Sequence, residues 1–402
     1  MNLALVHDDL IQHGGAERLF VVMAEIWPEA SVFTSMVAGK WKMLNDKWKI
    51  STSFMQHLPF KKKLYRAYFP LYPLAFESFD FSGFDVVLSS STRFAHGIIT
   101  KPETKHICYM NTPGRMFWEP REYFSSFRTG QFSSPPEEKP PRFSRRLGNR
   151  AGVGLLGVAL SPLLSWFRQW DYSAAQRVDY FIANSRSVKK KIKKYYGRDS
   201  EVIYPFVELE RFNKDVTRYP LRGNTESSST HTASPTPHND YFLIVSRLAS
   251  WKRIDIAIEA CNQLKLPLVI VGAGPDRRRL QKLAGPQVIF LGRLLDEDVI
   301  QCYQSCRALI FPQREDFGIT PLEAMASGKP VLAYKAGGAL ETVLPGETGE
   351  FFYPQMAEAL VRALSNFRPE KYNPAMCRNQ AARFSKQQFV ESMKHFVAKV
   401  SR

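Results

Sequence analysis

The sequence predicts an α/β protein with two domains, each built around a parallel sheet. Short apolar runs recur along the chain without polar alternation, which is typical of strands covered on both faces. Helical patterns separate these runs, and an alternation of strands and helices favours parallel sheets. The chain has 402 residues, of which 44% are hydrophobic, and this is enough for two ordinary domains with full cores.

The first domain is predicted to span residues 1–213. Its clearest strand candidates are the apolar runs at 3–6, 85–89, 106–109 and 180–183. The opening stretch M-N-L-A-L-V-H-D-D lacks the basic-then-apolar layout of a signal peptide, so we expect a strand there. The proline-rich stretch 133–141 is predicted to be an exposed loop of this domain.

The second domain, predicted at 241–386, has the more regular pattern. Its expected strands are 241–246, 267–271, 288–291, 308–311 and 330–334, and its expected helices are 254–264, 276–284, 296–305 and 321–326. The Ser/Thr/Pro-rich run at 222–240 contains almost no large apolar residue and cannot bury a core. We therefore predict a flexible linker or loop at 214–240.

The formal net charge of +17 indicates an anionic partner. Basic residues crowd between 139 and 198, where the only acidic residues are Asp171 and Asp179. Nucleic acid, an anionic membrane face and a phosphorylated substrate all fit such charge. Nucleic acid is not expected, because the chain has no helix-turn-helix or RNA-binding signature. The five Cys form no C-x-x-C pair and fit the buried, reduced thiols of a cytosolic protein.

Two segments are candidates for contact with a membrane surface. Residues 152–167 carry no charge, but they are fewer than the ~20 residues needed to span a bilayer. Residues 61–76 set Lys and Arg beside aromatic residues, which is typical of interfacial segments. A buried core helix with a solvated basic flank is the alternative, and a membrane-spanning segment is not expected.

Two glycine-containing motifs follow predicted strands. The run V-G-A-G-P-D-R-R-R-L (271–280) has Arg277 at the third glycine position of a dinucleotide fingerprint, which argues against a nicotinamide-dependent oxidoreductase. The run Q-H-G-G-A-E-R-L-F (12–20) opens a helix, so the N–H groups of Gly14 and Gly15 can approach an anion there. A plain tight turn is the alternative for this second run.

Charged residues mark two further places in the second domain. In S-R-L-A-S-W-K-R (246–253), Arg247 and Lys252 stand at the carboxyl edge of the sheet, where two cations can neutralise a diphosphate. In E-D-F-G-I-T-P-L-E (315–323), the pattern Thr320, Pro321, Glu323 is typical of a capping box. On that interpretation Glu323 only caps the helix and Glu315 is a solvated loop charge.

Together these motifs resemble one family. The chain contains, in order, S-R-L-A-S-W-K-R, V-G-A-G-P, F-L-G-R-L-L-D-E-D, F-P-Q-R-E-D-F-G-I-T-P-L-E-A-M-A-S-G-K-P-V and G-G-A-L-E-T-V. It resembles the retaining glycosyltransferases of family 4 over essentially its whole length, and its first half is most similar to the bacterial mannosyltransferase branch of O-antigen and exopolysaccharide synthesis. The resemblance implies the GT-B fold, in which two Rossmann-like domains face each other across a cleft. It also implies that the last helix, 387–402, packs back on the first domain.

The resemblance implies a role for each candidate residue. Glu323 would bind the ribose hydroxyls of a nucleotide-sugar, and Glu315 the hydroxyls of the transferred sugar. Arg247 and Lys252 would hold the diphosphate. The remaining implied donor contacts are the backbone amides of Phe317, Gly318 and Ile319 and the loop at Gly292 and Leu294, which would lie against the base.

The implied chemistry is retention at the anomeric carbon, without a metal or another cofactor. The departing phosphate would take the proton of the acceptor, stabilised by the two cations and the helix amides. The carboxylates of V-H-D-D (6–9) resemble a metal motif only superficially. Closure of the two domains would bring Gly14 and Gly15 to the donor and exclude water.

One position departs from the family. The family commonly has histidine in the place that Asn111 occupies in Y-M-N-T-P (109–113). An asparagine can form hydrogen bonds, but it carries neither a proton nor a charge. Donor identity, turnover or activity itself is therefore open, and a donor-binding, non-catalytic paralogue is an alternative. His96 and His106 are expected to be structural rather than substitutes.

The expected donor is a GDP- or UDP-hexose, with GDP-mannose favoured by the resemblance. The expected acceptor is a lipid-linked or polymeric glycan on the cytoplasmic side. These expectations imply a cytoplasmic protein that is peripheral on the inner face of the cell membrane. The base, sugar, acceptor and linkage are not fixed by the sequence.

Overall fold

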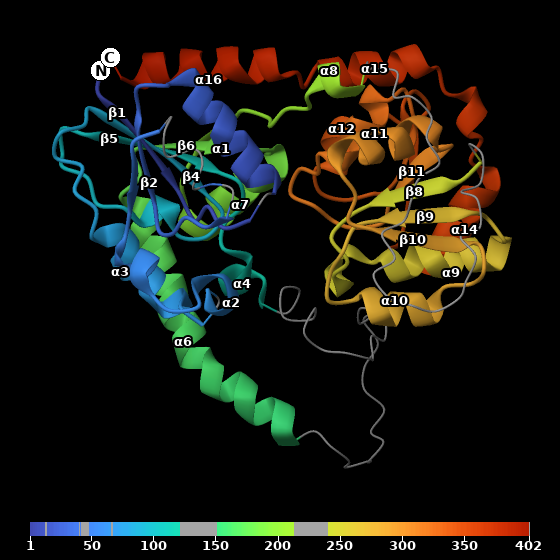
Figure 1. Cartoon of the computed structure of the whole chain (residues 1–402), viewed down its shortest axis with the longest axis horizontal. Coiled ribbons are helices and arrows are strands. Elements are labelled where there is room, and N and C mark those ends of the chain that lie inside the picture. Colours follow the sequence, from blue (N-terminus) through green and yellow to red (C-terminus); the bar gives the residue numbers. More distant parts are fainter. Residues whose placement is uncertain are drawn as a thin grey trace.

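The computed structural model consists of two α/β lobes, each around one sheet (Figure 1). It describes residues 1–401 except 13, 40, 42–47, 66, 121–150 and 213–239, and it does not describe the side chains of 62, 63 and 151–160. The predicted loop at 133–141 lies outside the described residues, as does the predicted linker apart from Asp240.

The first lobe contains a seven-stranded parallel sheet with the order β3-β2-β1-β4-β5-β6-β7. Its strands are β1 (Leu3–His7), β2 (Ser31–Thr34), β3 (Ile50–Thr52), β4 (Val86–Ser91), β5 (Lys105–Met110), β6 (Tyr180–Ala183) and β7 (Ser200–Val202). The strands predicted at 3–6, 85–89, 106–109 and 180–183 are confirmed within two residues. The sequence analysis did not identify β2, β3 and β7, because these strands are short and rich in Ser, Thr or Glu.

Helices cover both faces of this sheet, as a parallel sheet requires. They are α1 (Gly15–Ile26), α2 (Lys61–Leu64), α3 (Tyr72–Glu77), α4 (Arg115–Trp118), α6 (Ala151–Gln176) and α7 (Arg186–Tyr196). The short helix α8 (Leu209–Phe212) instead packs on the second lobe, where Phe212 belongs to the core. The core against α1 contains Leu5, Phe20 and Tyr109, all fully buried. A second, aromatic-rich core on the opposite face contains Tyr72 and Phe94.

The second lobe contains a six-stranded parallel sheet with the order β10-β9-β8-β11-β12-β13. Its strands are β8 (Phe242–Val245), β9 (Leu268–Val271), β10 (Val288–Gly292), β11 (Ala308–Phe311), β12 (Val331–Tyr334) and β13 (Gly349–Phe352). Its helices are α9 (Ile254–Leu264), α10 (Arg277–Leu283), α11 (Asp296–Ser305), α12 (Thr320–Ala326), α13 (Ala339–Thr342), α14 (Ala357–Asn366) and α15 (Pro374–Ala382). All five predicted strands and all four predicted helices are present, whereas β13 was not predicted.

The last helix, α16 (Lys386–Val400), returns to the first lobe and lies along its edge beside α1 (Figure 1). Its apolar face, which includes Phe389, Met393 and Phe396, is buried in the core that contains Phe20 and Tyr109. Both ends of the described chain, Leu3 in β1 and Val400 in α16, therefore contribute to the core of the first lobe.

The long helix α6 combines a buried and an exposed part. Phe167 stacks on Phe117 with ring centroids 5.0 Å apart, whereas Leu163 and Trp166 remain 40% and 45% exposed. The N-terminal half of the helix projects away from the lobe (Figure 1). Among the described residues, no helix is long and apolar enough to cross a membrane.

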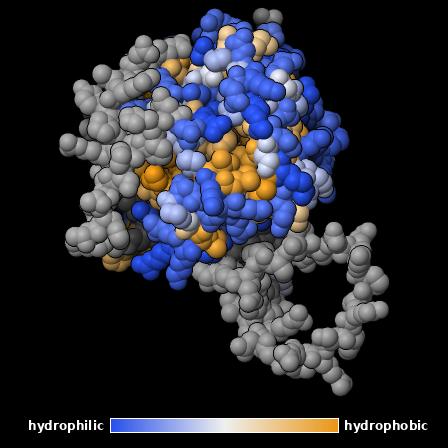
Figure 2. All heavy atoms as spheres, turned by 90° about the vertical axis from the view of Figure 1, so that its right-hand side faces the viewer, coloured by the Kyte–Doolittle hydropathy of each residue, from blue (hydrophilic) through white to orange (hydrophobic). Residues whose placement is uncertain are grey.

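The surface of the second lobe is mainly hydrophilic. Seen from that side, one apolar area near the middle is surrounded by polar residues (Figure 2). The five cysteines are buried and unpaired, as the sequence analysis expected. Burial raises the pKa of the thiols of Cys261, Cys302 and Cys306 to about 12, so these side chains behave as small apolar groups.

Candidate active site

Glu315 lies in the turn that leads from β11 into α12, and Glu323 lies in the first turn of α12. The carboxylate of Glu323 accepts a hydrogen bond from the hydroxyl of Tyr303 on α11, at 2.7 Å. The capping box expected for Thr320 and Glu323 is therefore wrong. The N-cap of α12 is Ile319, which has no side-chain cap, and the carboxylate instead satisfies a fully buried tyrosine hydroxyl.

Two arginines lie near the carboxylate of Glu323. Burial raises the pKa of Glu323, while the bond from Tyr303 and the charges of Arg18 and Arg211 act in the opposite direction, and the pKa stays above its usual value. Both arginines also pair with Asp296 on α11, at 2.9 and 2.8 Å. Because Arg18 is on α1, these contacts join the two lobes beside Glu323.

Lys252 forms an ion pair with Glu315. It ends the short 3₁₀ turn Ser250–Lys252 that follows β8, and its Nζ also lies 4.1 Å from the ring centroid of Trp251. Burial lowers the pKa of Lys252 well below its usual value, and the nearby charges of Arg115 and Arg247 add to this effect. Arg247 itself is exposed at the same edge of the sheet.

The turn between Glu315 and α12 is packed directly on glycine backbone. A Cβ at Gly337 would lie 2.0 Å from the carbonyl oxygen of Glu315, and one at Gly338 would lie 2.1 Å from that of Phe317. Gly318 has a φ of +86°, which favours glycine. Among the described residues, no acceptor pairs with the N–H groups of Gly318 and Ile319, so they are available at the start of α12.

The other glycine-rich turns of the second lobe also allow close backbone packing. A Cβ at Gly272 would lie 1.9 Å from the oxygen of Ser246, and one at Gly274 would lie 2.1 Å from that of Leu248. The N–H of Gly272 donates to the oxygen of Gly292 at 2.7 Å. The run 271–274 thus brings the loop of Gly292 and the partly buried Leu294 next to the turn that carries Arg247 and Lys252.

The two predicted anion-binding glycines of the first lobe behave differently. The N–H of Gly14 donates to the carboxylate of Glu17 at 2.8 Å, in a capping box of α1, so this group is already engaged. Gly15 faces the second lobe, since a Cβ there would lie 3.3 Å from Cδ1 of Ile319. Gly15 therefore meets the start of α12, while Gly14 stabilises its own helix.

Asn111, which follows β5, is held by its neighbours. Its side-chain amide donates to the hydroxyl of Ser90 at 3.1 Å and to the carbonyl of Ser91 at 3.4 Å. Its backbone carbonyl oxygen accepts a hydrogen bond from the side-chain amide of Asn184 at 2.8 Å. These bonds fix the position of the residue at the carboxyl edge of the first sheet.

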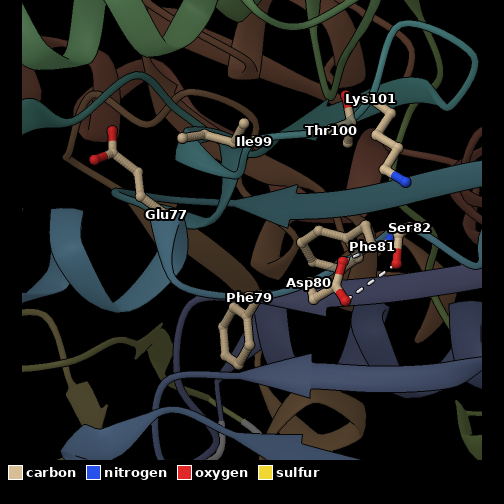
Figure 3. A pocket seen from close by; sticks show the side chains of 8 residues that line it. All are labelled: Glu77, Phe79, Asp80, Phe81, Ser82, Ile99, Thr100 and Lys101. Carbon is tan, nitrogen blue, oxygen red and sulfur yellow. Dashed lines mark hydrogen bonds between the residues drawn. The ribbon is translucent and has the colours of Figure 1, made fainter.

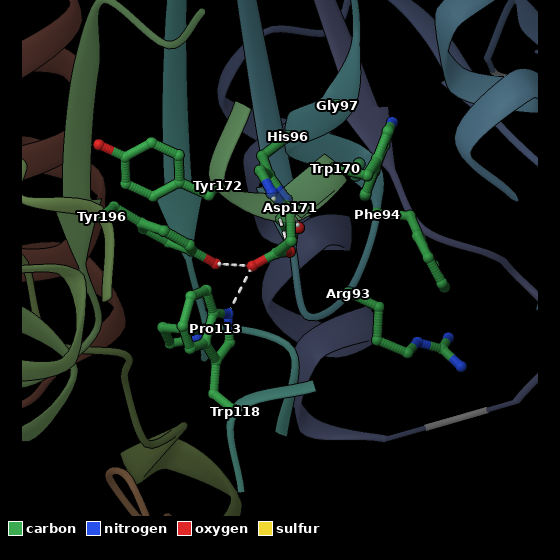
Figure 4. Close-up of polar contacts among 12 residues, drawn as sticks. Arg93, Phe94, His96, Gly97, Pro113, Trp118, Trp170, Asp171, Tyr172 and Tyr196 are labelled. Carbon is green, nitrogen blue, oxygen red and sulfur yellow. Dashed lines mark hydrogen bonds and ion pairs between the residues drawn. The ribbon is translucent and has the colours of Figure 1, made fainter. Parts of the chain in front are cut away.

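His96 and His106 are both fully buried inside the first lobe. His96 lies between the hydroxyl of Ser91, at 3.0 Å, and the carboxylate of Asp171 on α6, at 3.2 Å. The same carboxylate accepts hydrogen bonds from Trp118 and Tyr196 (Figure 4).

His106 contacts the hydroxyl of Ser89 at 2.9 Å, and burial lowers its pKa to about 3. The carboxylates of V-H-D-D are also used inside the lobe. Asp8 accepts from the backbone N–H groups of Phe94 and Ala95, at 2.7 and 2.8 Å, and Asp9 pairs with Arg93 at 2.5 Å. Among the described residues, no three His, Cys, Asp or Glu side chains gather in a way that could hold a metal ion.

The sequence analysis missed a second group of charges at this place. Asp316, next to Glu315, pairs with Arg115 at 2.7 Å and with Lys191 at 2.8 Å, and Lys191 also pairs with Glu119 at 2.7 Å. Arg115 ends the run N-T-P-G-R (111–115), which follows β5. Its place at the carboxyl edge of the first sheet was a signal that could have identified it.

A cavity of about 280 Å³ lies elsewhere on the first lobe (Figure 3). Its lining includes Glu77, Phe79, Phe81 and Lys101, and none of the predicted site residues. The candidate active site is therefore the place where the two lobes meet, around Glu315.

Comparisons with known proteins agree on one family. The model of glycosyl transferases group 1 matches residues 231–384, and the model of glycosyltransferase family 4 matches residues 13–211. The O-antigen chain mannosyltransferase C of Escherichia coli is 30% identical over 219 residues, which cover 52% of this chain and 54% of that protein. A GDP-mannose-dependent alpha-mannosyltransferase of Mycolicibacterium smegmatis is 40% identical over 106 residues, covering 26% of this chain and 28% of that one.

The same architecture is found in solved structures. HepE of Anabaena in complex with UDP and glucose superimposes with a TM-score of 0.66 at 18% sequence identity, covering 99% of both chains. This similarity shows the GT-B fold. The chain aligns with about half the length of the first curated relatives it matches.

Proposed function

The chain belongs to the family 4 glycosyltransferases, and we propose that it transfers mannose from GDP-mannose to a lipid-linked or polysaccharide acceptor with retention of configuration. The observation that carries this proposal is the position of Glu315. This carboxylate lies beside Lys252 and at the start of α12, where the two lobes meet. A sugar diphosphate placed there would meet a carboxylate for the sugar and positive charge for the phosphates.

The leaving diphosphate would be stabilised by Lys252, Arg247 and the N–H groups of Gly318 and Ile319. Cations and unpaired amides at a helix start bind phosphate oxygens and act most strongly on the charge that develops as the bond breaks. Burial disfavours the charge on Lys252, and a diphosphate beside it would favour the protonated form. This fixed positive charge takes the role that a metal ion has in other transferases, so the proposal requires no cofactor.

Donor binding would also change the partner of Glu315. In the free protein its carboxylate is paired with Lys252. A diphosphate would compete for that lysine and leave Glu315 to accept hydrogen bonds from hydroxyls of the sugar. Glu323, held by Tyr303, would accept from the ribose hydroxyls of the nucleotide.

In the transfer step the acceptor hydroxyl attacks the anomeric carbon on the face that the diphosphate leaves. The new bond forms between acceptor oxygen and anomeric carbon, and the bond from that carbon to the phosphate oxygen breaks. The departing phosphate oxygen takes the proton of the acceptor hydroxyl, so no separate base is needed. Asn111 would contact the sugar by hydrogen bonding only, because its amide carries no charge.

A UDP-sugar donor is the second candidate. It is favoured by the solved relative that binds UDP and glucose, while the mannosyltransferase relatives favour GDP-mannose. We further propose that the protein works at an anionic membrane surface. In support, α6 exposes Leu163 and Trp166, and the neighbouring α7 exposes Lys189 and Lys190.

The experiment that tests donor binding is thermal unfolding with GDP-mannose, UDP-glucose, UDP-N-acetylglucosamine and the bare nucleotides. A ligand at ~100 times its dissociation constant adds about 2.7 kcal/mol of stability. We expect stabilisation by GDP-mannose and GDP that is absent in Glu323→Ala. Stabilisation by UDP compounds alone would select the second candidate, and no stabilisation by any donor would refute both.

Transfer itself needs a separate assay, because a non-catalytic paralogue would bind the donor equally well. Release of GDP from GDP-mannose should rise when a membrane extract containing lipid-linked glycans is added. Glu323→Ala should abolish this rise. Donor binding without any acceptor-dependent release would favour the non-catalytic alternative.

A further inference from the structure

Four charged side chains from both lobes meet beside Glu315. The first lobe contributes Arg115, Lys191 and Glu119, and the second contributes Asp316. One oxygen of Asp316 accepts from Nη2 and Nε of Arg115 at 2.7 and 3.1 Å, and the other lies 2.8 Å from Nζ of Lys191. A single carboxylate of the second lobe is thus held by two cations of the first.

The environment of Asp316 makes this contact strong. The side chains of Asp316 and Lys191 are only 9% and 11% exposed. Burial acts to raise the pKa of Asp316, but the charges of Arg115 and Lys191 outweigh it and the pKa lies below its usual value. Removal of the charge of Asp316 alone is therefore costly, because Arg115 and Lys191 would lose their shared partner while they remain largely buried.

The cluster also contacts the residues that we assign to donor binding. Asp316 is the chain neighbour of Glu315, and Nη2 of Arg115 lies 3.9 Å from the carboxylate of Glu315. The guanidinium of Arg115 lies 5.3 Å from the ring centroid of Trp251, and the ring also contacts Lys252. A movement of Arg115 would therefore change the surroundings of both Glu315 and Lys252.

We propose that Asp316, Arg115 and Lys191 form a latch that holds the two lobes together and thereby positions Glu315. Asp316 is then a positioning residue, which acts through its neighbour rather than on the substrate. This inference rests on the proposed transfer only for its effect on rate. Its effect on the arrangement of the lobes is independent of any substrate.

The chain offers a matched control for the latch. Asp199 also forms an ion pair, with Lys193 on α7, but the two side chains are 88% and 60% exposed and both belong to the first lobe. Exposed pairs are screened by water and contribute little. Asp316→Asn and Asp199→Asn therefore make the same chemical change in a buried contact between the lobes and in an exposed contact within one lobe.

The test combines small-angle X-ray scattering, nucleotide-dependent thermal shift and transfer kinetics on the full chain. We expect Asp316→Asn to increase the radius of gyration and to lower kcat by about 100-fold, the cost of a displacement of roughly 1 Å in a catalytic site. The thermal shift at one fixed nucleotide concentration should stay close to that of the wild type, because the second lobe still holds the nucleotide. Asp199→Asn should match the wild type in all three measurements.

Lys191→Met provides a second variant, on the side of the first lobe. If the two residues share one function, the double variant with Asp316→Asn should transfer no more slowly than Asp316→Asn alone. Fully additive losses would overturn the latch. An Asp316→Asn protein with the radius of gyration of the wild type, or one that no longer responds to nucleotide, would overturn it as well.

These measurements separate the latch from the proposed function. If no donor is turned over by the wild type, the proposed function fails, while the radius of gyration still decides about the latch. If transfer is found but scattering and rate are unchanged in Asp316→Asn, the latch fails and the function stands.

Discussion

Gly338 lies so close to Phe317 that a Cβ added to Gly338 would stand 2.1 Å from the carbonyl oxygen of Phe317. The N–H of Gly338 also donates to the carbonyl oxygen of Glu315 at 2.9 Å. The turn that carries Glu315 therefore lies directly on the backbone of the next loop. The position of the carboxylate depends on the absence of side chains behind it.

The substitution Gly338→Ala tests this dependence. The φ and ψ of Gly338 are −67° and −18°, which alanine adopts readily, so only the clash with Phe317 distinguishes the two residues. We expect the free energy of unfolding to fall by about 1–3 kcal/mol, the usual range for overpacking. We also expect the nucleotide-induced thermal shift to disappear.

Thermal unfolding with and without nucleotide measures both effects. Gly83→Ala is the control, because a Cβ at Gly83 meets no atom within 4 Å. A Gly338→Ala protein that still responds to nucleotide as the wild type does would show that this turn can shift without harm to the site.

Lys252→Met should reduce transfer more than donor binding. The methionine fills a similar volume but offers no charge to the leaving diphosphate, and loss of one such group typically lowers kcat by about 100- to 1000-fold. Initial rates at saturating donor measure the effect. Lys399→Met is the control, since Lys399 is 61% exposed and pairs with the exposed Glu201 at 3.5 Å. A rate close to that of the wild type would remove Lys252 from the proposed mechanism.

The pattern of apolar residues along the chain was enough to predict most of the fold. It failed for strands whose conformation depends on their neighbours in the sheet. The run L-V-I-V of β9 is apolar throughout, whereas I-S-T of β3 and S-E-V of β7 have no pattern that separates them from loops. Sheet neighbours decide the conformation of such short edge strands.

The same limit applies to the site. The motif series in the second half of the chain led to Glu315, Lys252 and Glu323 because these residues lie in recognisable runs. The partner of Asp316, by contrast, is Arg115, 201 positions away, and the partner of Glu323 is Tyr303 on another helix. Neither contact has a local signature, and both became visible only when the fold had placed them.

His106 should make the protein less stable in mild acid. Burial lowers its pKa to about 3, against ~6.5 in an unfolded chain. Between these values the unfolded state binds a proton that the folded state excludes, so stability falls as the pH falls, by roughly 1.4 kcal/mol per pH unit. Above pH ~6.5 the contribution is constant.

Comparison of the wild type with His106→Gln measures this effect. The glutamine remains neutral, whereas the other titrating groups act equally in both proteins. The variant should therefore lose roughly 1.4 kcal/mol less of its free energy of unfolding per pH unit than the wild type does. Chemical unfolding at several pH values between 7 and 4.5 provides the data. Parallel curves would show that His106 is protonated in the folded protein or is not a determinant of acid stability.

Asp171 should be a main determinant of the stability of the first lobe. Its carboxylate accepts from Trp118 and Tyr196, both at 2.7 Å, and lies 3.2 Å from His96 (Figure 4). Asp171→Ala would leave these buried donors without an acceptor, at about 1–3 kcal/mol each. We expect a clearly lower Tm for the first lobe. The near-UV signal of its aromatic residues measures this unfolding.

Asp199→Ala is the matched control, because Asp199 is 88% exposed and pairs with the exposed Lys193. Such surface changes usually stay within about 0.5 kcal/mol. Equal Tm values for the two variants would mean that water or a rearranged neighbour replaces the carboxylate of Asp171.

The exposed apolar residues of α6 should decide whether the protein binds membranes. Leu163 and Trp166 can enter the interface of a bilayer, and the lysines on α7 can be attracted to anionic lipid, which together give salt-sensitive binding. We expect the protein to float with vesicles of phosphatidylcholine and phosphatidylglycerol at low salt, and the double variant Leu163→Ser, Trp166→Ser to remain in solution.

Leu295→Ser is the control, since Leu295 is 76% exposed but lies on the second lobe. Because Leu163 and Trp166 are not part of the core, the double variant should keep its thermal shift with nucleotide, so a loss of flotation can be attributed to the surface. Equal flotation of the double variant and the wild type would assign membrane contact to another part of the chain, and no flotation of the wild type would refute it.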